Sequence, residues 1–566
     1  MTTPLDAPQK QSRPWIWPLL IASTLGLSAL AIVLTAGPGT PLATASAKPV
    51  ESPIAQEPKP EPKPEPNPVA PEFPEKMDWL NTAGPITMKD LKGKIVLLDF
   101  WTLCCINCIH TLPDLAKLEK KYANEIVVIG VHSAKFDNEK ETSSIRKAVL
   151  RYEIAHPVVN DADHKIWEKY GVTSWPTLMV VGSDGNVVGA VSGEGNFELL
   201  DKVIGNLIEE GKKNKTLNET PIRFDLVRFR EKGDTPLFFP GKVLADEVGK
   251  RLFIADSTHH RVVITDLDGK KLGIIGSGSP GYKNGKFAEA QFDDPQGLAL
   301  DGDLLYIADR KNHSVRAANL KTGEVKLFAG TGQQDSKSRF TDTPADPLKT
   351  GLNSPWDLLL VDRTLFIAMA GHHQIWAYDL KADKIQVYAG DGRENLKDGP
   401  LYASSFAQPS GLTTDGKSLY VADSEVSAIR KLSLDGNGRV ETLIGEGLFE
   451  FGDKDGTGKE VRIQHALGVM AHEGKIIIAD TYNNKLKLLD PKTLECKTLA
   501  VVGELGNKEP LFNEPAGMSI AAGKLYVADT NAHRIRVVDL KTLKVATLAM
   551  TGVEPPPPQK DWQPKK

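Results

Sequence analysis

Hydrophobic and polar positions divide the chain into four stretches. Residues 15–36 form a nearly uninterrupted apolar run, and residues 57–66 alternate proline with charged residues. From residue 77 to 215, apolar runs of strand length alternate with segments of helical periodicity. From 222 to 551, short apolar strands recur at a regular interval. Because these two patterns are typical of different folds, the sequence predicts two globular domains behind an N-terminal apolar segment.

The first globular region, residues 77–215, is predicted to be α/β. Strands are expected at 94–101, 126–131, 156–160, 177–181 and 186–191, and helices at 106–123, 138–152, 163–170 and 196–213. The strand–helix–strand order at its start predicts parallel pairing. Gly182-Ser183-Asp184-Gly185, between the last two strands, predicts a hairpin turn.

The second region, residues 222–551, contains six copies of one strand motif. The copies, 49–60 residues apart, are Phe253–Asp256, Tyr306–Asp309, Phe366–Met369, Tyr420–Asp423, Ile477–Asp480 and Tyr526–Asp529. Five end in Ala-Asp, and the third ends in Ala-Met. Each copy belongs to a unit of about four short strands, which at this period predicts a six-bladed β-propeller.

The apolar run at residues 15–36 has the length that a bilayer core requires. Lys10 and Arg13 precede it, which favours a transmembrane signal anchor with residues 1–14 in the cytosol and the bulk of the chain on the extracytoplasmic, periplasmic side. Ala45-Ser46-Ala47 resembles a signal-peptidase site, so a secreted or periplasmic chain cleaved near Ala47 is the alternative.

Composition adds two flanking segments and one exclusion. Residues 37–76 are rich in proline and are predicted to be an extended linker, and residues 552–566 a disordered tail. The formal net charge of −4 gives no argument for nucleic acid as a partner, because that requires a basic face.

A Cys-x-x-Cys pair, Cys105 and Cys108, lies where the strand at 94–101 gives way to a helix. Free N–H groups and the dipole at a helix N-terminus stabilise a thiolate, which is the form that attacks a disulfide. A second thiol one turn away can then release the mixed disulfide. The only other cysteines are Cys104 and Cys496, so the second Cys-x-x-Cys pair of a typical zinc site is missing. We therefore expect redox chemistry without a metal or cofactor.

Three motifs occur in the order found in thioredoxin-like domains: Asp99-Phe100-Trp101, Cys105-x-x-Cys108 and Trp175-Pro176-Thr177. The region resembles the extracytoplasmic thiol-disulfide oxidoreductases tethered to bacterial membranes. The resemblance implies that Cys105 is the nucleophile, that Cys108 resolves the mixed disulfide and that Pro176 is a cis proline beside them. It also implies that Asp99 is a buried acid that takes the proton of Cys108.

The motif departs from thioredoxins at two places. Cys104 stands where they carry tryptophan, and Ile106-Asn107 replaces the usual Gly-Pro. Cys104 is either a small apolar replacement or an alternative disulfide partner. Without a basic residue between the cysteines, strong oxidant behaviour is not expected. Trp101 and Trp175 are possible accessory residues.

The turns after the repeated strands, such as His259-His260-Arg261-Val262 and Asn312-His313-Ser314-Val315, resemble NHL repeats. NHL propellers usually serve as protein-binding platforms. The histidines raise a metal hypothesis, but their recurrence at one position in the blades favours a structural role in the turn. The aspartates are expected to cap turns in the same way.

A thioredoxin-like domain joined to six NHL repeats resembles the NHL repeat-containing protein 2 family, over residues 77–551. The leading hypothesis is a membrane-tethered thiol-disulfide oxidoreductase. It would act on a protein substrate or redox partner that carries a disulfide or dithiol, with a protein ligand on the propeller face. The alternative is a non-catalytic scaffold with a redox-inactive thioredoxin-like domain. A peroxidase is disfavoured, because the sequence lacks a Pro-x-x-x-Thr-x-x-Cys motif.

Overall fold

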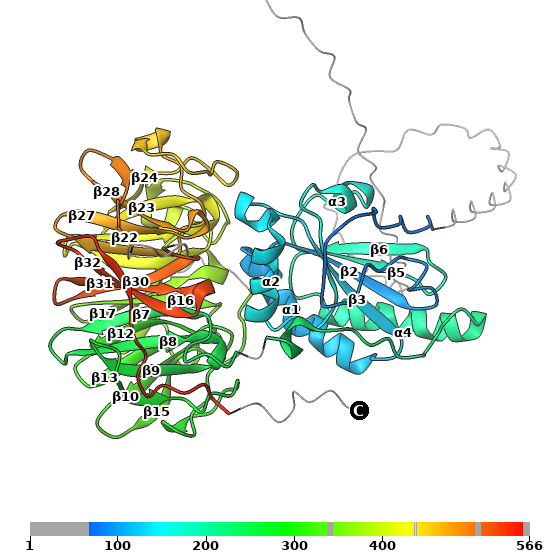
Figure 1. Ribbon diagram of the computed structural model, residues 1–566, viewed down its shortest axis with the longest axis horizontal. Coiled ribbons are helices and arrows are strands. Elements are labelled where there is room, and N and C mark those ends of the chain that lie inside the picture. Colours follow the sequence, from blue (N-terminus) through cyan, green and yellow to red (C-terminus); the bar gives the residue numbers. More distant parts are fainter. Residues whose placement is uncertain are drawn as a thin grey trace, which may run out of the picture. The chain divides into compact units, whose positions relative to one another are not determined.

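The computed structural model describes residues 67–231, 233–336, 343–434, 436, 438–503 and 511–557. These residues belong to one compact unit that contains an α/β domain and a β-propeller (Figure 1). The predicted anchor at residues 15–36 and the site near Ala47 lie outside the described residues. Within the described part of the chain, none of the helices is long and apolar enough to cross a membrane.

A six-stranded sheet with the order β1-β4-β3-β2-β5-β6 organises the first domain. Its strands are β1 (Trp79–Leu80), β2 (Ile95–Trp101), β3 (Ile126–His132), β4 (Val158–Asn160), β5 (Thr177–Val181) and β6 (Val187–Ser192). As the sequence predicts, β2 pairs in parallel with β3, and β5 and β6 form an antiparallel hairpin. The two-residue β1 was not predicted, because it is too short to show a periodicity.

Helices cover both faces of this sheet. They are α1 (Ile106–Lys121), α2 (Thr142–Arg151), α3 (Lys165–Lys169) and α4 (Phe197–Asn214), with the 3-10 turns η1 (Asp137–Lys140) and η2 (Val227–Phe229). The prediction of one helix over 138–152 was wrong, because Glu141 has an extended backbone that separates η1 from α2. On one face of the sheet, Leu97 packs with Leu115 of α1 and Ile204 of α4. Strand β2 is buried along its whole length, so α1 starts from a rigid support.

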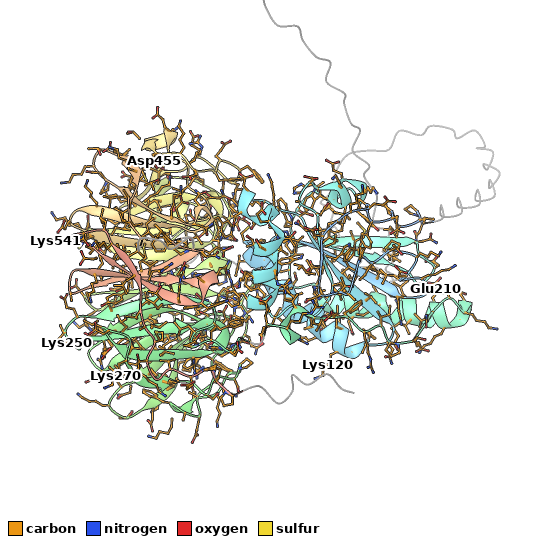
Figure 2. All side chains as sticks on the ribbon, viewed as in Figure 1. Lys120, Glu210, Lys250, Lys270, Asp455 and Lys541 are labelled. Atoms are coloured by element: carbon orange, nitrogen blue, oxygen red, sulfur yellow. The ribbon has the colours of Figure 1, made fainter. Side chains whose placement is uncertain are left out.

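The second domain is a propeller of six antiparallel sheets, as the repeats predict. The first three blades comprise β7 (Pro240–Asp246), β8 (Arg251–Asp256), β9 (Arg261–Asp266), β10 (Lys271–Ile275); β11 (Gly285–Lys286), β12 (Pro295–Asp301), β13 (Leu304–Asp309), β14 (Ser314–Asn319), β15 (Glu324–Ala329); and β16 (Pro355–Val361), β17 (Thr364–Met369), β18 (Gln374–Asp379), β19 (Lys384–Ala389). The last three comprise β20 (Gly399–Pro400), β21 (Pro409–Thr414), β22 (Ser418–Asp423), β23 (Ala428–Ser433), β24 (Arg439–Ile444); β25 (Gly456–Thr457), β26 (Gly468–His472), β27 (Lys475–Asp480), β28 (Lys485–Leu489), β29 (Glu495–Thr498); and β30 (Pro515–Ala521), β31 (Lys524–Asp529), β32 (Arg534–Asp539), β33 (Val545–Thr547). Charged side chains such as Lys250, Lys270, Asp455 and Lys541 lie on its outer surface (Figure 2).

One turn position in each blade bonds to the following blade. It is left-handed, with φ between 46° and 56°, and its side chain accepts a backbone N–H from just before the next innermost strand at 2.7–3.4 Å. The position is occupied by His260, His313, His373, Ser427, Asn484 and His533. The last of these accepts from Phe239 of the first blade and so closes the ring. The recurrent histidines therefore have a structural role between blades.

The repeated aspartates bond within their own blade. Each of the five accepts a backbone N–H from the segment leading into the innermost strand, at 2.5–2.8 Å. Met369 replaces the sixth, and its sulfur accepts from the Asn353 N–H at 3.4 Å. The other carboxylate oxygen bonds the turn that follows, as predicted; for example, Asp309 accepts from the Asn312 amide at 2.9 Å. The bond between segments about 16 residues apart was not predicted.

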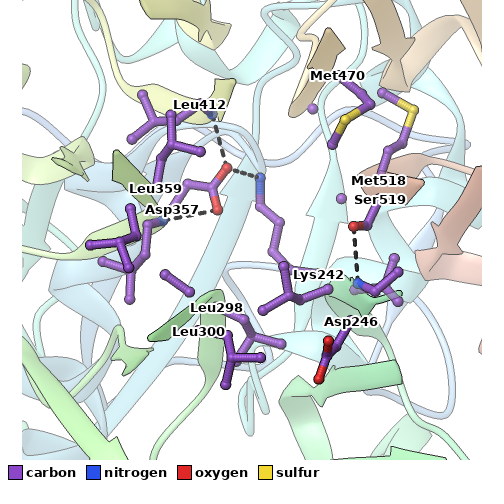
Figure 3. Close-up of a pocket in the computed structure, with 18 of the residues that line it drawn as sticks. Lys242, Asp246, Leu298, Leu300, Asp357, Leu359, Leu412, Met470, Met518 and Ser519 are labelled. Atoms are coloured by element: carbon purple, nitrogen blue, oxygen red, sulfur yellow. Dashed lines mark hydrogen bonds and ion pairs between the residues drawn. The ribbon is translucent and has the colours of Figure 1, made fainter. Parts of the chain in front are cut away.

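The innermost strands β7, β12, β16, β21, β26 and β30 surround a central cavity of about 330 Å³. Lys242 of β7 reaches across it (Figure 3). Its ammonium group donates to Asp357 Oδ2 at 3.1 Å and to the carbonyls of Ser410 and Leu467 at 2.7 and 2.9 Å. Three acceptors from three other blades therefore fix this buried cation and narrow the channel.

Candidate dithiol site

Cys105 is the N-cap of α1, directly after the buried strand β2 and its short loop. Its sulfur accepts the Cys108 backbone N–H at 3.4 Å, and its side chain is partly exposed. Helix N–H groups that point at a sulfur stabilise its thiolate. Of the two cysteines in the motif, Cys105 is therefore the one placed to meet a disulfide.

Cys108 lies one turn further along α1 and is buried, with an exposed fraction of 1%. Burial raises the pKa of its thiol well above the ordinary value, and the neighbouring Cys105 and Asp99 raise it further. Asp99 on β2 is fully buried, and burial raises the pKa of its carboxyl to about 7. The two groups are thus close enough to interact, and both hold their proton more tightly than in water.

The other residues predicted for the site lie around the same loop. Trp175–Pro176 is a cis peptide, and Trp175 packs, as Cys105 does, against the apolar cluster that includes Cys108. Trp101 is buried and meets His132 edge-to-face, with ring centroids 4.8 Å apart. Pro113 lies inside α1.

A buried carboxylate, Glu139, shapes the loop between β2 and α1. It accepts from the Cys104 N–H at 3.0 Å and from the N–H groups of Lys135 and Phe136 at 2.9 and 3.0 Å, and it bonds the Thr102 hydroxyl. These bonds tie the loop to the segment after β3, and so help to fix the position of Cys105 at the start of α1.

The propeller contacts the residues on both sides of Cys105. The Gln408 amide accepts the Ile106 N–H at 2.9 Å and donates to the Cys104 carbonyl at 3.0 Å. This amide thus fixes the loop between β2 and α1 from the propeller side. It also accepts one of the backbone N–H groups at the start of α1, which have no partner within the helix. Phe239 and Tyr482 of the propeller also belong to the apolar cluster around Cys104 and Cys108.

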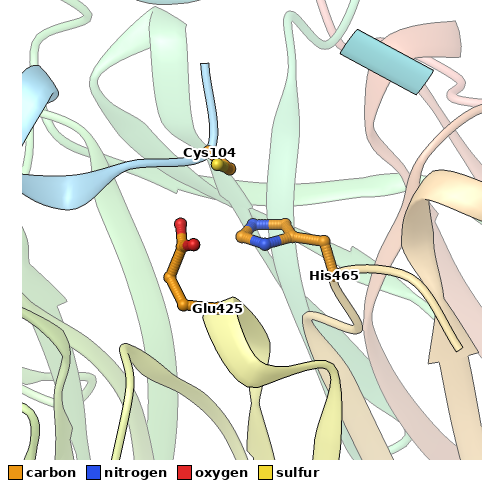
Figure 4. Close-up of side chains that lie close together, drawn as sticks. All are labelled: Cys104, Glu425 and His465. Carbon is orange, nitrogen blue, oxygen red and sulfur yellow. The ribbon is translucent and has the colours of Figure 1, made fainter. Parts of the chain in front are cut away.

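Cys104, Glu425 and His465 gather at this interface, with potential ligand atoms within 4.8 Å of one another (Figure 4). Their chemistry fits a metal poorly. The buried Lys135 ammonium bonds Glu425 and already compensates its charge, and burial raises the pKa of Cys104 well above the ordinary value, which keeps a thiol where a metal needs a thiolate. Burial also lowers the pKa of His465 to about 4, so its imidazole is neutral. The three groups and Lys135 pack together between the domains, where Lys135 bonds Glu425, while Glu425 Oε1 and His465 Nδ1 make no hydrogen bond to the described residues.

Many of the contacts from the propeller come from one repeated position. The residues just before the innermost strands all have positive φ, from 49° to 61°, and they are Phe239, Asp294, Ser354, Gln408, His465 and Glu514. Ser354 bonds His110 of α1 at 2.7 Å, and Glu514 pairs with Arg151 of α2 at 2.6 Å. The side chains differ between blades, and this variation matches the uneven surface of the thioredoxin-like domain.

Sequence reasoning missed these propeller residues and also His156. Gln408, Glu425 and His465 lie about 300 residues or more from the dithiol, and only the fold brings them there. A usable signal was present, however. Three of the six blades start with Pro-x-Gly, and the position before the innermost strand differs in all six, which is typical of a surface that meets a non-repeating partner.

Comparison with known proteins agrees with this arrangement. A family model described as thioredoxin-like matches residues 93–187, and one for the NHL repeat matches 292–317 and 512–538. Human NHL repeat-containing protein 2 is 42% identical over 490 residues, which cover 80% of this chain and 67% of that protein. The Arabidopsis thaliana protein SUPPRESSOR OF QUENCHING 1, chloroplastic, is 45% identical over 472 residues, or 80% of this chain and 44% of that protein. Thiol-disulfide oxidoreductase ResA of Bacillus thuringiensis is 31% identical over 119 residues, which cover 21% of this chain and 66% of that protein.

Fold and site together define a class of protein in which a thioredoxin-like domain with a Cys-x-x-Cys dithiol is joined to an NHL-repeat propeller. Within that class, the chain belongs to the NHL repeat-containing protein 2 family. It spans less than half of the Arabidopsis relative and about two thirds of the human one.

Proposed function

We propose that the chain is a thiol-disulfide oxidoreductase. The observation that carries the proposal is the placement of two thiols: a partly exposed Cys105 at the N-terminus of α1 and a buried Cys108 beside Asp99. Cys105 as thiolate attacks a substrate disulfide and forms a mixed disulfide, releasing one substrate thiol. Cys108 loses its proton and attacks the Cys105 sulfur, which releases the second thiol and leaves a Cys105–Cys108 disulfide. The same steps in reverse oxidise a substrate dithiol.

The propeller is proposed to hold the protein substrate or redox partner near the dithiol. Its bonds to Ile106 and to the Cys104 carbonyl fix the loop that a substrate must approach. The printed name of the Bacillus relative, a thiol-disulfide oxidoreductase, supports the same chemistry for the thioredoxin-like domain. The partner is therefore expected to be a protein that carries an accessible disulfide or dithiol.

A membrane location forms part of the proposal. Residues 15–36 would anchor the chain, and the proline-rich residues that follow would carry the domains on the extracytoplasmic side. The linker predicted over 37–76 is shorter at its end, because Ala70 and Phe73 are buried in the core of the first domain. Cell fractionation with mass spectrometry of the N-terminus tests it. An intact N-terminus in the membrane fraction supports the anchor, whereas a soluble chain that begins after Ala47 supports cleavage.

Redox titration of the purified chain against glutathione tests the chemistry, with the dithiol fraction followed by alkylation and mass spectrometry. A reversible Cys105–Cys108 disulfide with a potential of about −270 to −180 mV is expected. Cys108→Ser should abolish the transition, and Cys496→Ser, which alters a buried cysteine in the fifth blade, should leave it unchanged. If Cys105 and Cys108 never form a disulfide, or if the disulfide that forms contains Cys104 instead, the proposal is contradicted.

A non-catalytic scaffold is the second candidate, because the propeller already bonds the residues beside Cys105. A protein that binds partners through its propeller and uses the thioredoxin-like domain only for its shape would keep partner binding in Cys105→Ser and Cys108→Ser. The oxidoreductase instead predicts that Cys108→Ser traps substrates as mixed disulfides on Cys105.

A further inference from the structure

A group of polar atoms without partners lies beneath the dithiol. Both carboxylate oxygens of Asp99, Nε1 of Trp101 and Nε2 of His156 are buried and make no hydrogen bond to the part of the protein that the structure describes. Leaving such groups unpaired costs about 1–3 kcal/mol each, so sets of this kind usually enclose an ordered water. None of the steps of thiol exchange described above uses Trp101 or His156.

Gly130 on β3 leaves room among these atoms. It is the register partner of Asp99 on β2, so the two residues lie side by side in the sheet. A methyl group built on Gly130 would lie 3.0 Å from Trp101 Nε1, 3.1 Å from Val158 Cγ2 and 3.5 Å from His156 Nε2. The glycine therefore leaves a small space that is bordered by a donor, an imidazole nitrogen, a valine methyl group and the strand that carries the carboxyl group.

The other ring nitrogen of His156 faces a carboxylate that is in contact with solvent. Nδ1 lies 3.4 Å from Glu119 Oε2 on α1, and the Glu119 side chain is 27% exposed while that of His156 is 3% exposed. Burial lowers the pKa of His156, but the neighbouring Glu119 and Asp99 raise it by more, so the pKa lies above the ordinary value. The charged groups that face this path are Asp99 from β2, Glu119 from α1 and Arg228, which interacts with Glu119.

We propose that His156 and Glu119 form a proton path between Asp99 and solvent, through a water molecule held in the space at Gly130. When Cys108 attacks the mixed disulfide, its proton passes to the Asp99 carboxylate. It then passes through the water to His156 Nε2, while the proton on Nδ1 leaves through Glu119. Reduction of the disulfide runs the path backwards. His156 acts here as a positioning and proton-transfer residue that does not touch the sulfur atoms.

This inference rests on the proposed dithiol chemistry, and one assay separates the two. The reduced full-length chain is mixed with dithiodipyridine, whose disulfide Cys105 opens with release of one thiopyridone. Attack by Cys108 on the resulting mixed disulfide releases the second thiopyridone. The first release reports Cys105 alone, and the second reports deprotonation and attack by Cys108.

His156→Gln and Gly130→Ala are expected to slow the second release at least about tenfold near neutral pH, and to leave the first release unchanged. Glutamine cannot carry a proton, and the alanine methyl group fills the water site without changing any charge. At alkaline pH the difference should disappear, because hydroxide can take the proton of Cys108 directly. Glu119→Gln should show the same pH dependence with a smaller slowing.

The matched control is His472→Gln, which makes the same change at a partly exposed histidine in the fifth blade. A second release that matches wild type in His156→Gln and Gly130→Ala at every pH would overturn the path, and so would a slowing that is equal at every pH. If wild type itself shows only the first release, the proposed dithiol chemistry fails and the path fails with it. Because the two variants disturb the site in different ways, either one carries the test if the other misfolds.

Discussion

Asp99 illustrates how burial can dominate the pKa of a side chain. Its carboxyl is fully buried, and within the described structure neither oxygen has a hydrogen-bond partner to stabilise the charged form. Burial raises its pKa to about 7, while the nearby His156 lowers it only in part. The group is therefore half-protonated near neutral pH, which suits it to exchange a proton with Cys108.

Asp99→Asn should make the protein more stable above neutral pH. In the unfolded chain an aspartate has a pKa of about 3.9, whereas in the fold it is about 7. Between these values the folded state binds more protons, so wild type loses stability as pH rises from about 4 to about 7. The asparagine variant escapes this loss, and its advantage should grow over that window to about 4 kcal/mol.

Calorimetry of both proteins across this pH range measures the difference. The test is the change of this stability difference with pH, because the substitution also alters local packing, and that contribution is the same at every pH. An advantage that stays constant from acid to neutral pH would contradict the raised pKa of Asp99. Asp114→Asn makes the same substitution at a partly exposed aspartate on α1 and serves as the control.

Local sequence was enough to predict Cys105, Cys108, Asp99 and Pro176 as one site, since each occupies a fixed place on a strand, a helix or a turn of the thioredoxin-like pattern. His156 was missed for a physical reason. It lies two residues before the short strand β4, and only the opening at Gly130 and the contact with Glu119 give it a role. Those facts depend on packing, which periodicity does not encode.

At the scale of elements, the turn histidines connect one blade to the next. The blades consist of consecutive strands, so the described propeller is not closed by exchange of a strand between its ends. The bond from the Phe239 N–H to His533 Nδ1, at 3.1 Å, instead joins the first blade to the last. Sequence predicted the number of blades, but it did not show where the ring closes, because the six turns look alike.

His533→Ala should destabilise the propeller by about 1–3 kcal/mol, since it leaves the buried Phe239 N–H without its acceptor and places alanine at a positive φ. His533→Asn should retain most of the stability. The chain already uses asparagine at the equivalent position, where Asn484 Oδ1 accepts the Glu514 N–H at 2.7 Å.

Urea unfolding of the two variants and wild type checks this prediction, with His472→Ala as a control that should stay within about 0.5 kcal/mol of wild type. Equal losses in the alanine and asparagine variants would contradict a role for the hydrogen bond. They would instead indicate that the imidazole acts through packing against Phe238 and Phe239.

At the scale of the whole molecule, the buried ion pair between Lys135 and Glu425 joins the two domains. Lys135 follows β3 of the thioredoxin-like domain, and Glu425 lies in the turn after β22 of the propeller. Their side chains are 6% and 4% exposed. Cys104 lies against the same carboxylate and against His465. Because both domains cover its thiol, the reactivity of Cys104 reports how often they separate.

Lys135→Ala should make Cys104 far more reactive. Removing one partner of a buried ion pair leaves an uncompensated charge and costs about 3–5 kcal/mol. In this protein that cost weakens the contact between the domains, and opening lets Glu425 regain water. Labelling of Cys104 by N-ethylmaleimide, followed by mass spectrometry, is expected to become at least about tenfold faster.

Two controls test whether the faster labelling of Cys104 arises from the domain interface. Cys496 is buried within the fifth blade, where burial raises the pKa of its thiol to about 12, and its labelling should not change. Lys117→Ala removes a largely exposed pair with Asp114 and should leave Cys104 as slow as in wild type. If labelling of Cys104 and of Cys496 becomes faster to the same extent in Lys135→Ala, the substitution promotes unfolding of the whole chain. That result would contradict the prediction that the ion pair controls separation of the two domains. If Cys104 alone accelerates, the propeller is a removable cover over the residues beside Cys105, and a partner that binds both domains can control access to the dithiol.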